Sequence, residues 1–415
     1  MPKLTASRPA NLKHDNRNAI LQHVYHHDII SKPDICKSLG MSKPTVSMLV
    51  DELVNENVLA VLGRGNSTTQ GGKRPLLYTF NAAVGLVIAL HIGIEKVRGA
   101  LVDLKTNLHS RIELPLHHTP AGDAVELALV AIDSAVNRLI THAGALKSPV
   151  LGIGVSAPGV VESHKGILVR AIHLENWSEV PIGPRLESEF HLPVWVDNES
   201  RNTALAEKWF GVGKNLNTFI TVQTRDGIGT GIMQDGATYR GLDFSAGEFG
   251  HTTIDINGPL CRCGNRGCWE LYGSEQALLT STAADLPLHP ASLLAKRIHT
   301  GEALTIQMMG DAYQEGDEFA VQQVDAYALR LAAGLINLVN AFNPEAIILH
   351  DNLSVFGPLF LERLSAIVQK SALRSAANRV TIQYAEFVQD TAIIGAATLV
   401  IKEFVEGRML WKRAN

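Results

Sequence analysis

The densest group of potentially reactive side chains lies between Glu248 and Glu270. One histidine and three cysteines in this stretch match the soft ligands of a closed tetrahedral zinc site. These four residues are His251, Cys261, Cys263 and Cys268. Gly264 and Gly267 lie inside the last loop of the group, where a tight return around a metal needs backbone angles that glycine adopts cheaply. The pattern predicts a structural Zn²⁺.

Two alternatives to zinc remain open for these cysteines. The chain contains four cysteines, and three of them lie within eight residues of one another, so a chance cluster of reduced thiols is possible. A disulfide is less favoured, because an intracellular chain would keep such thiols reduced. We favour zinc because His251 lies upstream of the cysteines at a plausible ligand spacing.

Glu248 and Glu270 flank the four possible ligands. A metal that holds this loop would also fix the two carboxylates, which could then accept hydrogen bonds from hydroxyl groups such as those of a sugar. The alternative is that both glutamates are merely solvated. Their spacing alone does not decide between these two interpretations.

The charge of the chain is divided unevenly. The 415 residues carry a net charge of −4, with 46% hydrophobic and 19% charged residues, which is typical of a soluble globular protein. Residues 1–80 carry ten Lys/Arg and six Asp/Glu, so the remaining residues have a net charge of −8. A basic first segment on an acidic body suits a protein that meets phosphate only through that segment. Because we find no membrane-spanning run or signal peptide, we expect a cytoplasmic protein.

Three short helices are predicted in the basic segment. Residues 16–27 have apolar residues on one helical face, and Ser31 and Ser42 are typical N-cap residues for two further helices. Gly40 would end the second helix, which leaves a two-residue turn before the third. This tight junction resembles a helix-turn-helix. The segments 58–62 and 74–80 then favour a β-hairpin wing.

Six side chains are candidates for DNA contact. Three project from the start of the third helix, where recognition helices place base and phosphate contacts, and three flank the tip of the wing. They are Lys43, Thr45 and Ser47 on the helix, and Arg64, Lys73 and Arg74 on the wing. Each charge taken singly could be a solvated surface residue, but together with the three helices they predict operator DNA as a partner.

A glycine-rich pattern carries a resemblance to a known family. Gly227-Ile-Gly-Thr-Gly231, followed by Gly241, Gly247, Gly250-His251 and Cys-x-Cys-Gly-x-x-Gly-Cys-x-Glu, resembles the signature of the ROK family (repressors, open reading frames, sugar kinases). The match runs from about Leu86 to the end of the chain. Within the transcription-factor branch it looks most like the Mlc/NagC-type sugar repressors. The resemblance implies an α/β fold, with an N-terminal winged helix-turn-helix and a two-lobed actin-like ATPase (ribonuclease H-like) sugar-kinase body.

The resemblance also implies a sugar site. Asn198 matches the sugar-binding asparagine of the family, and Glu199 stands where the kinases have their aspartate base. Arg201 replaces a second asparagine of the motif. We expect a sugar site in which five side chains hold the sugar hydroxyls. They are Asn198, Glu199, Glu248, His251 and Glu270. Because a glutamate displaces the carboxylate by about one methylene, efficient proton abstraction is less expected than sugar binding.

Three elements that bind ATP in the kinases of this family are altered here. His91, Gly93 and Glu95 replace Asp-x-Gly-x-Thr, Arg225 and Asp226 replace Gly-Thr, and His350 and Asp351 replace a glycine pair. Histidine is a poor ligand for Mg²⁺, and the added carboxylates would repel phosphate. We therefore expect no kinase activity. The glycines of Gly227–Gly231 are interpreted as serving a turn.

The predicted domains are 1–81 (winged helix-turn-helix), 82–195 (first α/β lobe, completed by the C-terminal helix 392–415) and 196–391 (second α/β lobe with the zinc knuckle and the sugar site). The leading hypothesis is a homodimeric or homotetrameric repressor that senses a sugar or sugar phosphate. Rival hypotheses are a sugar kinase that binds DNA, a repressor controlled by a sugar-transporter domain through the C-terminal helix, and an activator.

Overall fold

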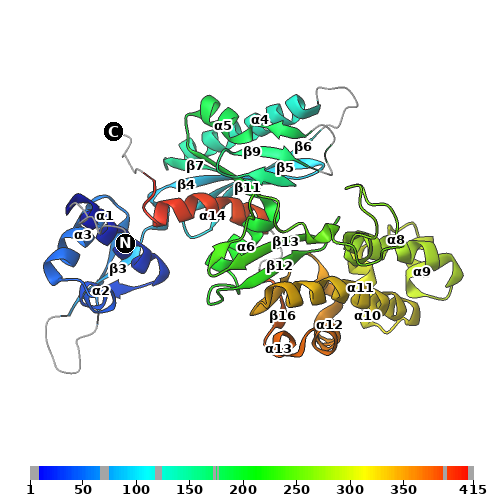
Figure 1. Ribbon diagram of the computed structural model, residues 1–415. Helices are drawn as coiled ribbons and strands as arrows, with labels where there is room; N and C mark the ends of the chain where they lie inside the picture. The colour runs from blue at the N-terminus through cyan, green and yellow to red at the C-terminus, as the bar shows by residue number, and fades with distance from the viewer. Residues whose placement is uncertain are drawn as a thin grey trace.

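The computed structural model describes residues 9–65, 74–116, 124–171, 174, 177–386 and 390–409 (Figure 1). The N-terminal head contains three helices and a three-stranded sheet of order β1-β3-β2. The helices are α1 (Pro9–His26), α2 (Lys32–Leu39) and α3 (Lys43–Asn55). The strands are β1 (Ile30–Ser31), β2 (Leu59–Arg64) and β3 (Leu76–Phe80). These elements form a winged helix-turn-helix.

Local hydrogen bonds fix the junction between α2 and α3. The Ser31 hydroxyl accepts from the backbone N–H of Asp34, while the Asp34 carboxylate accepts from the Ser31 N–H, which completes a capping box. Gly40 ends α2 with a φ of 64°. Ser42 accepts from the Thr45 N–H and so begins α3. Both helices therefore begin where the sequence predicts, and α2 also ends there.

The body contains two five-stranded sheets. The first has the order β11-β7-β4-β5-β6, and the second has the order β14-β13-β12-β15-β16. Strands of the first sheet are β4 (Leu86–Ile92), β5 (Lys96–Asp103), β6 (Leu108–Pro115), β7 (Val150–Ala157) and β11 (Val194–Asn198). Strands of the second are β12 (Phe219–Gln223), β13 (Gly229–Gln234), β14 (Ala237–Thr238), β15 (Ala346–Leu349) and β16 (Thr381–Tyr384). Each sheet combines parallel and antiparallel pairs, as expected for the actin-like sugar-kinase fold.

Helices cover the outer faces of these sheets and fill the space between them (Figure 1). The first sheet carries α4 (Ala124–Ala145) and α5 (Ile182–Phe190). The remaining helices of the body are α6 (Glu199–Trp209), α7 (Glu270–Gly273), α8 (Glu275–Asp285), α9 (Leu293–His299), α10 (Ile306–Gln314), α11 (Glu318–Phe342), α12 (Gly357–Ser371), α13 (Arg374–Ala377) and α14 (Thr391–Val405). Of these, α6 and α14 lie against each other between the two sheets.

Glycines allow this central pair of helices to approach its neighbours closely. A Cβ at Gly154 on β7 would lie 1.9 Å from the carbonyl oxygen of Ala396 on α14, and one at Gly395 would lie 2.4 Å from the carbonyl oxygen of Asn202 on α6. A Cβ at Gly231 on β13 would lie 2.0 Å from the Ser200 carbonyl oxygen. The interpretation of Gly229 and Gly231 as turn glycines is therefore wrong, because both lie in β13 and make room for α6.

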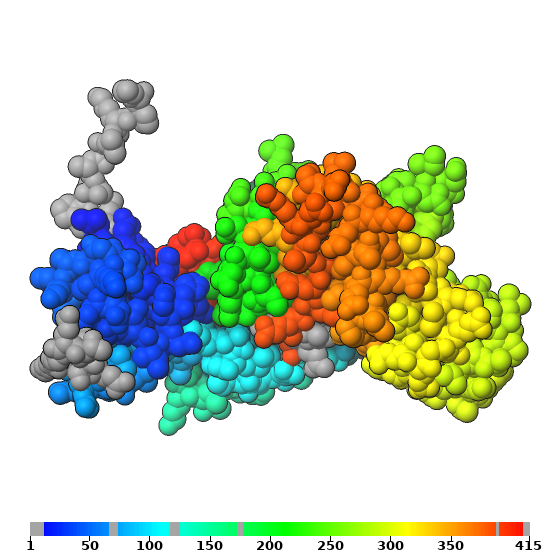
Figure 2. Space-filling view, turned by 90° about the horizontal axis from the view of Figure 1, so that it is seen from below, coloured from blue at the N-terminus to red at the C-terminus, as the bar shows by residue number. Residues whose placement is uncertain are grey.

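The head and the first sheet share one buried apolar cluster. It joins Ile20 and Leu49 of the head to Val87 of β4 and to Ile393 and Val400 of α14. The second sheet belongs to two other apolar clusters, and the larger of them includes residues of helices α8 to α12. Figure 2 shows the consequence: the blue head lies at one end of an elongated molecule, next to the red α14.

Several elements are missing from the sequence predictions. Strand β6 was not predicted, and neither was the small sheet of β8 (Val160–Glu162), β9 (Ile167–Arg170) and β10 (Ser178–Val180). The apolar residues of α14, which could have faced a partner, are almost all buried in the core. None of the helices in the described residues is long and apolar enough to cross a membrane.

We predict that Gly154→Ala destabilises the body, because the new methyl group would overlap the Ala396 carbonyl. The expected loss is about 3 kcal/mol, measured as a fall of roughly 5 °C or more in melting temperature. Gly144→Ala is the matched control: a Cβ there meets nothing within 4 Å, and alanine is the better helix former. Equal melting temperatures for the two variants would contradict the packing argument.

Candidate functional site

The structure brings the four predicted metal ligands together. The ligand atoms of His251, Cys261, Cys263 and Cys268 all lie within 4.8 Å of one another. Short backbone bridges pair Thr253 with Cys268 and Leu260 with Arg266. Gly264 and Gly267 have φ values of 94° and 62°, the left-handed conformation predicted for this loop. The cluster is thus assembled almost entirely from one chain segment.

The spacing inside this cluster fits a tetrahedral metal. The Cys263 and Cys268 sulfurs lie 3.6 Å apart, and Cys261 Sγ lies 3.7 Å from His251 Nδ1. A tetrahedron with Zn–S bonds of about 2.3 Å and Zn–N bonds of about 2.0 Å has edges of this length. Burial raises the pKa of the Cys261 and Cys268 thiols, so a bound metal would have to displace protons from them. The four residues could therefore hold a metal ion.

Glu270 and Glu248 lie beside the metal cluster, in different surroundings. Glu270 is buried at the start of α7, and its Oε1 accepts a hydrogen bond from Cys261 Sγ (3.1 Å) and lies 3.4 Å from His251 Nδ1. Burial raises the pKa of Glu248, although the nearby His251 lowers it. Glu248 lines a pocket together with four other residues, which are Gly159, Val160, Arg170 and Cys263. Glu248 is therefore placed to meet a small molecule in this pocket.

Asn198 joins this pocket to the start of α6. Its side-chain oxygen caps the helix by accepting from the N–H groups of Ser200 (2.9 Å) and Arg201 (3.2 Å). Its amide nitrogen donates to the Gly159 carbonyl at 2.7 Å. These bonds position Asn198 firmly, but they also use hydrogen-bonding capacity that the sequence interpretation assigned to a sugar.

Glu199 contacts His91, the residue that stands in place of the first aspartate of the kinase pattern. Its Oε2 lies 2.8 Å from His91 Nε2, and His91 Nδ1 lies 2.8 Å from an Arg98 guanidinium nitrogen. Burial is the largest single influence and favours the neutral form of Glu199, but the hydrogen bond and electrostatic interaction with His91, together with Arg225 and Arg98, outweigh it and hold the pKa of Glu199 below its usual value. The carboxylate at the base position is therefore ionised and already engaged.

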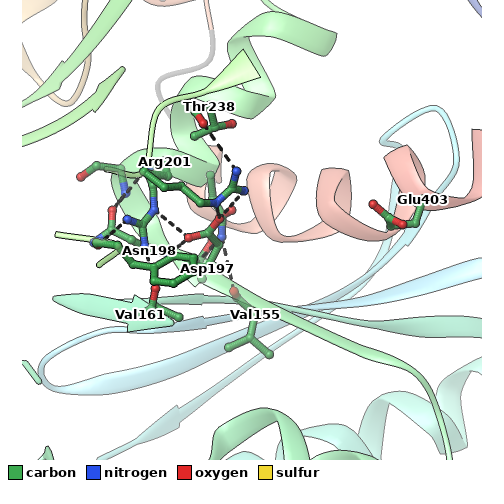
Figure 3. A network of polar contacts seen from close by, with 12 residues as sticks. Val155, Val161, Asp197, Asn198, Arg201, Thr238 and Glu403 are labelled. Carbon is green, nitrogen blue, oxygen red and sulfur yellow. Dashed lines mark hydrogen bonds and ion pairs between the residues drawn. The ribbon is translucent and has the colours of Figure 1, made fainter. Parts of the chain in front are cut away.

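A buried ion pair anchors the segment that carries Asn198 and Glu199 (Figure 3). Asp197 Oδ1 accepts from Arg201 Nε at 2.7 Å, and its Oδ2 accepts from Arg240 Nη2 at 2.8 Å. Arg201 also donates to the carbonyls of Phe244 (2.7 Å) and Val161 (3.0 Å). The arginine thus ties the end of β11 to β8 and to the loop before Glu248. Sequence analysis missed Asp197, although an acid at the end of a buried strand was a usable signal, and Arg240 had no such signal.

The loop that binds phosphate in the kinases is occupied here by a carboxylate of the chain itself. Asp351 Oδ2 accepts from the Thr224 N–H at 2.7 Å, and Asp351 Oδ1 lies 3.4 Å from Arg225 Nη2. Glu275 accepts from the N–H and the side chain of Asn352, both at 2.9 Å. Glu95 and Asp226, which also depart from the kinase pattern, are exposed.

His350, the other replacement in this region, faces a buried glutamate. His350 Nε2 lies 3.4 Å from Glu207 Oε1. Within the described residues neither atom has a hydrogen-bond partner, while Glu207 Oε2 accepts from the Val212 N–H at 2.9 Å. Burial raises the pKa of Glu207 to about 7 and lowers the pKa of His350 to about 4. The histidine is therefore neutral at pH 7, and the glutamate is only partly ionised.

The predicted DNA-contacting residues differ in how freely they face outward. Lys43, Arg64 and Arg74 are exposed, whereas Lys73 lies outside the described residues. The Thr45 hydroxyl bonds to that of Ser42 at 2.8 Å. Ser47 accepts from Lys32 Nζ (3.0 Å) and donates to Asp51 (3.2 Å), and Lys32 pairs with Asp51 at 2.6 Å. Lys32 of α2 therefore lies against the outward face of α3, a position that sequence analysis did not single out.

Comparison with known proteins extends over nearly the whole chain. A model described as the ROK family matches residues 87–403. A putative xylose repressor from Caldicellulosiruptor sp. (strain Rt8B.4) is 33% identical over 396 residues, which cover 95% of this chain and 98% of the relative.

Two solved structures resemble the fold. A ROK family transcriptional regulator, described as a homolog of the Escherichia coli Mlc protein, matches 95% of this chain and 97% of its own with a TM-score of 0.81 and 24% identity. A ROK family glucokinase from Streptomyces griseus, in complex with glucose and AMPPNP, matches 76% of this chain and 99% of its own with a TM-score of 0.65 and 27% identity. The match to the regulator therefore includes both the head and the body. The match to the kinase covers a share of this chain about equal to the body alone.

We predict that Glu207→Gln stabilises the protein in a pH-dependent way. The pKa of Glu207 in the folded protein (about 7) lies above its ordinary value of 4.5, so its favourable contribution is complete below about pH 4.5 and is lost as the pH rises through 7. Glutamine cannot ionise, and its amide can donate to neutral His350. Thermal unfolding should show little difference at pH 5 and a gain of about 2–3 kcal/mol at pH 8. The exposed Glu189→Gln should show no such trend, and a pH-independent effect of Glu207→Gln would refute the assignment.

Proposed function

Because the chain belongs to the ROK family, we propose that it is a DNA-binding transcriptional repressor of carbohydrate genes that a neutral sugar releases from its operator. One observation carries the proposal: the carboxylates and the histidine expected to hold a sugar lie together, whereas Asp351 occupies the phosphate loop. Such a protein retains sugar recognition without ATP chemistry. The xylose-repressor relative, aligned through the head and the body, supports the same function.

The charges of the pocket favour a neutral sugar over a sugar phosphate. Glu248 lines the pocket and interacts electrostatically with Glu199 and Glu270, as well as with Arg201 and His251; Glu270 Oε1 lies 3.4 Å from His251 Nδ1. A phosphate brought among three carboxylates would be repelled, whereas sugar hydroxyls can donate to them. Arg170 is one cation in the pocket lining, but it is exposed. D-xylose is the first sugar to test, because of the name of the relative.

The same contacts argue against kinase activity. Transfer of phosphate to a sugar needs a base within reach of the sugar hydroxyl, and Glu199 is held by His91 instead. It also needs a loop whose N–H groups are available to phosphate, and the Thr224 N–H is bonded to Asp351. A kinase that also binds DNA remains the alternative enzyme hypothesis.

The metal cluster would serve this function as a structural zinc site. Its donor set and spacing fit Zn²⁺, which when bound would supply a fixed positive charge and brace the loop. His251 would hold the ion through Nδ1, the atom nearest Cys261, which leaves Nε2 for a sugar hydroxyl. Glu270 would lie beside the ion, because its Oε1 is 3.4 Å from the same Nδ1 and 3.1 Å from Cys261 Sγ.

The head would bind operator DNA through α3 and the wing, by means of Lys43, Thr45, Ser47, Arg64, Lys73 and Arg74. Its pairing in a homodimer or homotetramer would set the spacing of two half-sites. A domain division at 1–81, 82–195 with the C-terminal helix, and 196–391 suits this arrangement, and such a regulator works in the cytoplasm. Control by a transporter domain is a second candidate, although α14 is buried through Val405.

Operator binding tests the proposed function. The labelled DNA upstream of the gene is titrated with full-length protein at about 150 mM salt, with D-xylose, D-glucose, L-xylose or their phosphates added. We expect one neutral D-sugar to weaken operator binding at least tenfold, with L-xylose and the phosphates inactive. Release only by a phosphorylated sugar would refute the charge argument. Tight binding that no sugar disturbs would refute sugar sensing, and ATP-dependent phosphorylation of a sugar would establish the kinase.

We also predict that the purified protein carries about one zinc ion per chain, measured by mass spectrometry of the metal. Cys268→Ser should lose the metal and weaken sugar binding by about tenfold or more, since His251 and Glu248 would no longer be held. Cys36→Ser is the matched control, because Cys36 lies in α2, outside the cluster. A Cys268→Ser protein that keeps both zinc and sugar affinity would rule out this assignment.

A further inference from the structure

One helix connects the proposed sugar site to the DNA-binding head. Helix α6 begins next to Asn198, with Glu199 as its first residue, and ends at Trp209. The Trp209 ring lies 5.8 Å from the Tyr25 ring and 5.5 Å from the His26 ring, measured between centroids. Tyr25 and His26 are at the end of α1 in the head. An 11-residue helix spans about 16 Å, so a single rigid element covers the distance between the two places.

Tyr25 is held by the first sheet. Its hydroxyl donates to the Leu104 carbonyl at 2.6 Å. Lys105 donates to the Tyr25 carbonyl at 2.8 Å and lies 4.6 Å from the centre of its ring. Leu104 and Lys105 directly follow β5, and the apolar core of the head is continuous with β4 and β5. The head is therefore attached to the first sheet.

Helix α6 contacts both sheets: it follows β11 of the first sheet directly, its Asn202 donates to Ser156 Oγ of β7 at 2.8 Å, and it also packs on the second sheet. A Cβ at Gly229 or Gly231 of β13 would lie 2.3 Å from Ser200 Oγ or 2.0 Å from its carbonyl oxygen, so the strand and the helix are in close backbone contact. Ala204 of α6 packs in one cluster with Phe219 of β12. A displacement of the second sheet relative to the first would therefore act on α6 through β13, at a helix that is also held by the first sheet.

Trp209 thus lies where the two parts of the body meet the head. On one side Tyr25 is fixed to the first sheet by Leu104 and Lys105, and on the other side Trp209 moves with α6. The first residue of the same helix, Glu199, follows β11 and contacts His91 of β4 in the first sheet. A ligand that changes this contact changes how α6 sits against the first sheet at one end, and the other end contacts the head.

We propose that α6 transmits sugar binding to the head, with Trp209 as the coupling residue through its contacts with Tyr25 and His26. This inference rests on the proposed function, because it names how the sugar site regulates DNA binding. A sugar must bind one arrangement of α6 more tightly than the other to have any effect on the operator, and such coupling is typically about 5-fold to 150-fold in affinity.

The test measures the factor by which saturating D-xylose weakens operator binding by full-length protein. We expect at least about tenfold for the wild type and less than about twofold for Trp209→Ala. D-xylose affinity of the variant, measured by calorimetry, should stay within about threefold. Trp209→Phe keeps an aromatic ring against Tyr25 and should give an intermediate factor, which also guards against a folding defect in the alanine variant. A full sugar response in Trp209→Ala would overturn the proposal.

Phe404→Ala is the matched control. Phe404 also places an aromatic ring against the head, 6.4 Å from the ring of Phe80, but from α14 instead of α6. We expect this variant to keep most of the sugar response. If Phe404→Ala loses the response as completely as Trp209→Ala, the coupling depends on the whole interface between head and body, and the role of α6 is refuted.

A second measurement needs no sugar, and so separates this inference from the proposed function. Operator affinity is measured for Glu199→Gln, for Trp209→Ala and for the double variant. If α6 couples its two ends, the effect of Glu199→Gln on operator affinity should change by at least about threefold when Trp209 is absent. Additive effects would overturn the proposal. If no sugar releases the wild type while this cycle is non-additive, sugar sensing fails and the coupling through α6 stands.

Discussion

The paired, buried carboxylate of Asp197 is the interaction on which the position of the Asn198–Glu199 segment depends. It is 1% exposed and satisfies two arginines, Arg201 and Arg240, which come from separate segments. Removal of either arginine would leave part of a buried charge unpaired, which is far more costly than the loss of a surface ion pair. Asn198 and Glu199 follow Asp197 directly, so their positions relative to Gly159 and His91 are set by this network (Figure 3).

The departures from the kinase pattern compensate one another. His91 stands in place of one aspartate and contacts Glu199, which stands in place of another. Arg225 and Asp351 likewise replace residues of two separate nucleotide-binding elements and pair with each other. Each substitution taken alone suggests the decay of a kinase. Together they give contacts between the replaced residues themselves, His91 with Glu199 and Arg225 with Asp351.

The sequence predicted best what depends on neighbouring residues. The bounds of α2 and α3 follow from Ser31, Gly40 and Ser42, whose capping bonds span only three residues, and the metal cluster lies within one short loop. Contacts between distant segments were not predictable in this way. His91 and Glu199 are 108 positions apart, and nothing in the sequence around either residue shows that they meet. The glycines of β13 were misinterpreted for the same reason, because the helix that requires them lies elsewhere in the chain.

The ion pair between Lys32 and Asp51 bears on how such a head could evolve a new operator preference. Ser47 hydrogen-bonds to both charges, so replacement of Ser47 or Asp51 would leave Lys32 with fewer partners and alter the attraction for any DNA along with the contact to a base. Met48 is exposed on the same helix and carries no charge, so its replacement changes the shape of the helix surface without altering its charge. In a head that binds DNA as proposed, position 48 could therefore diverge by single steps, whereas positions 32, 47 and 51 require coordinated changes.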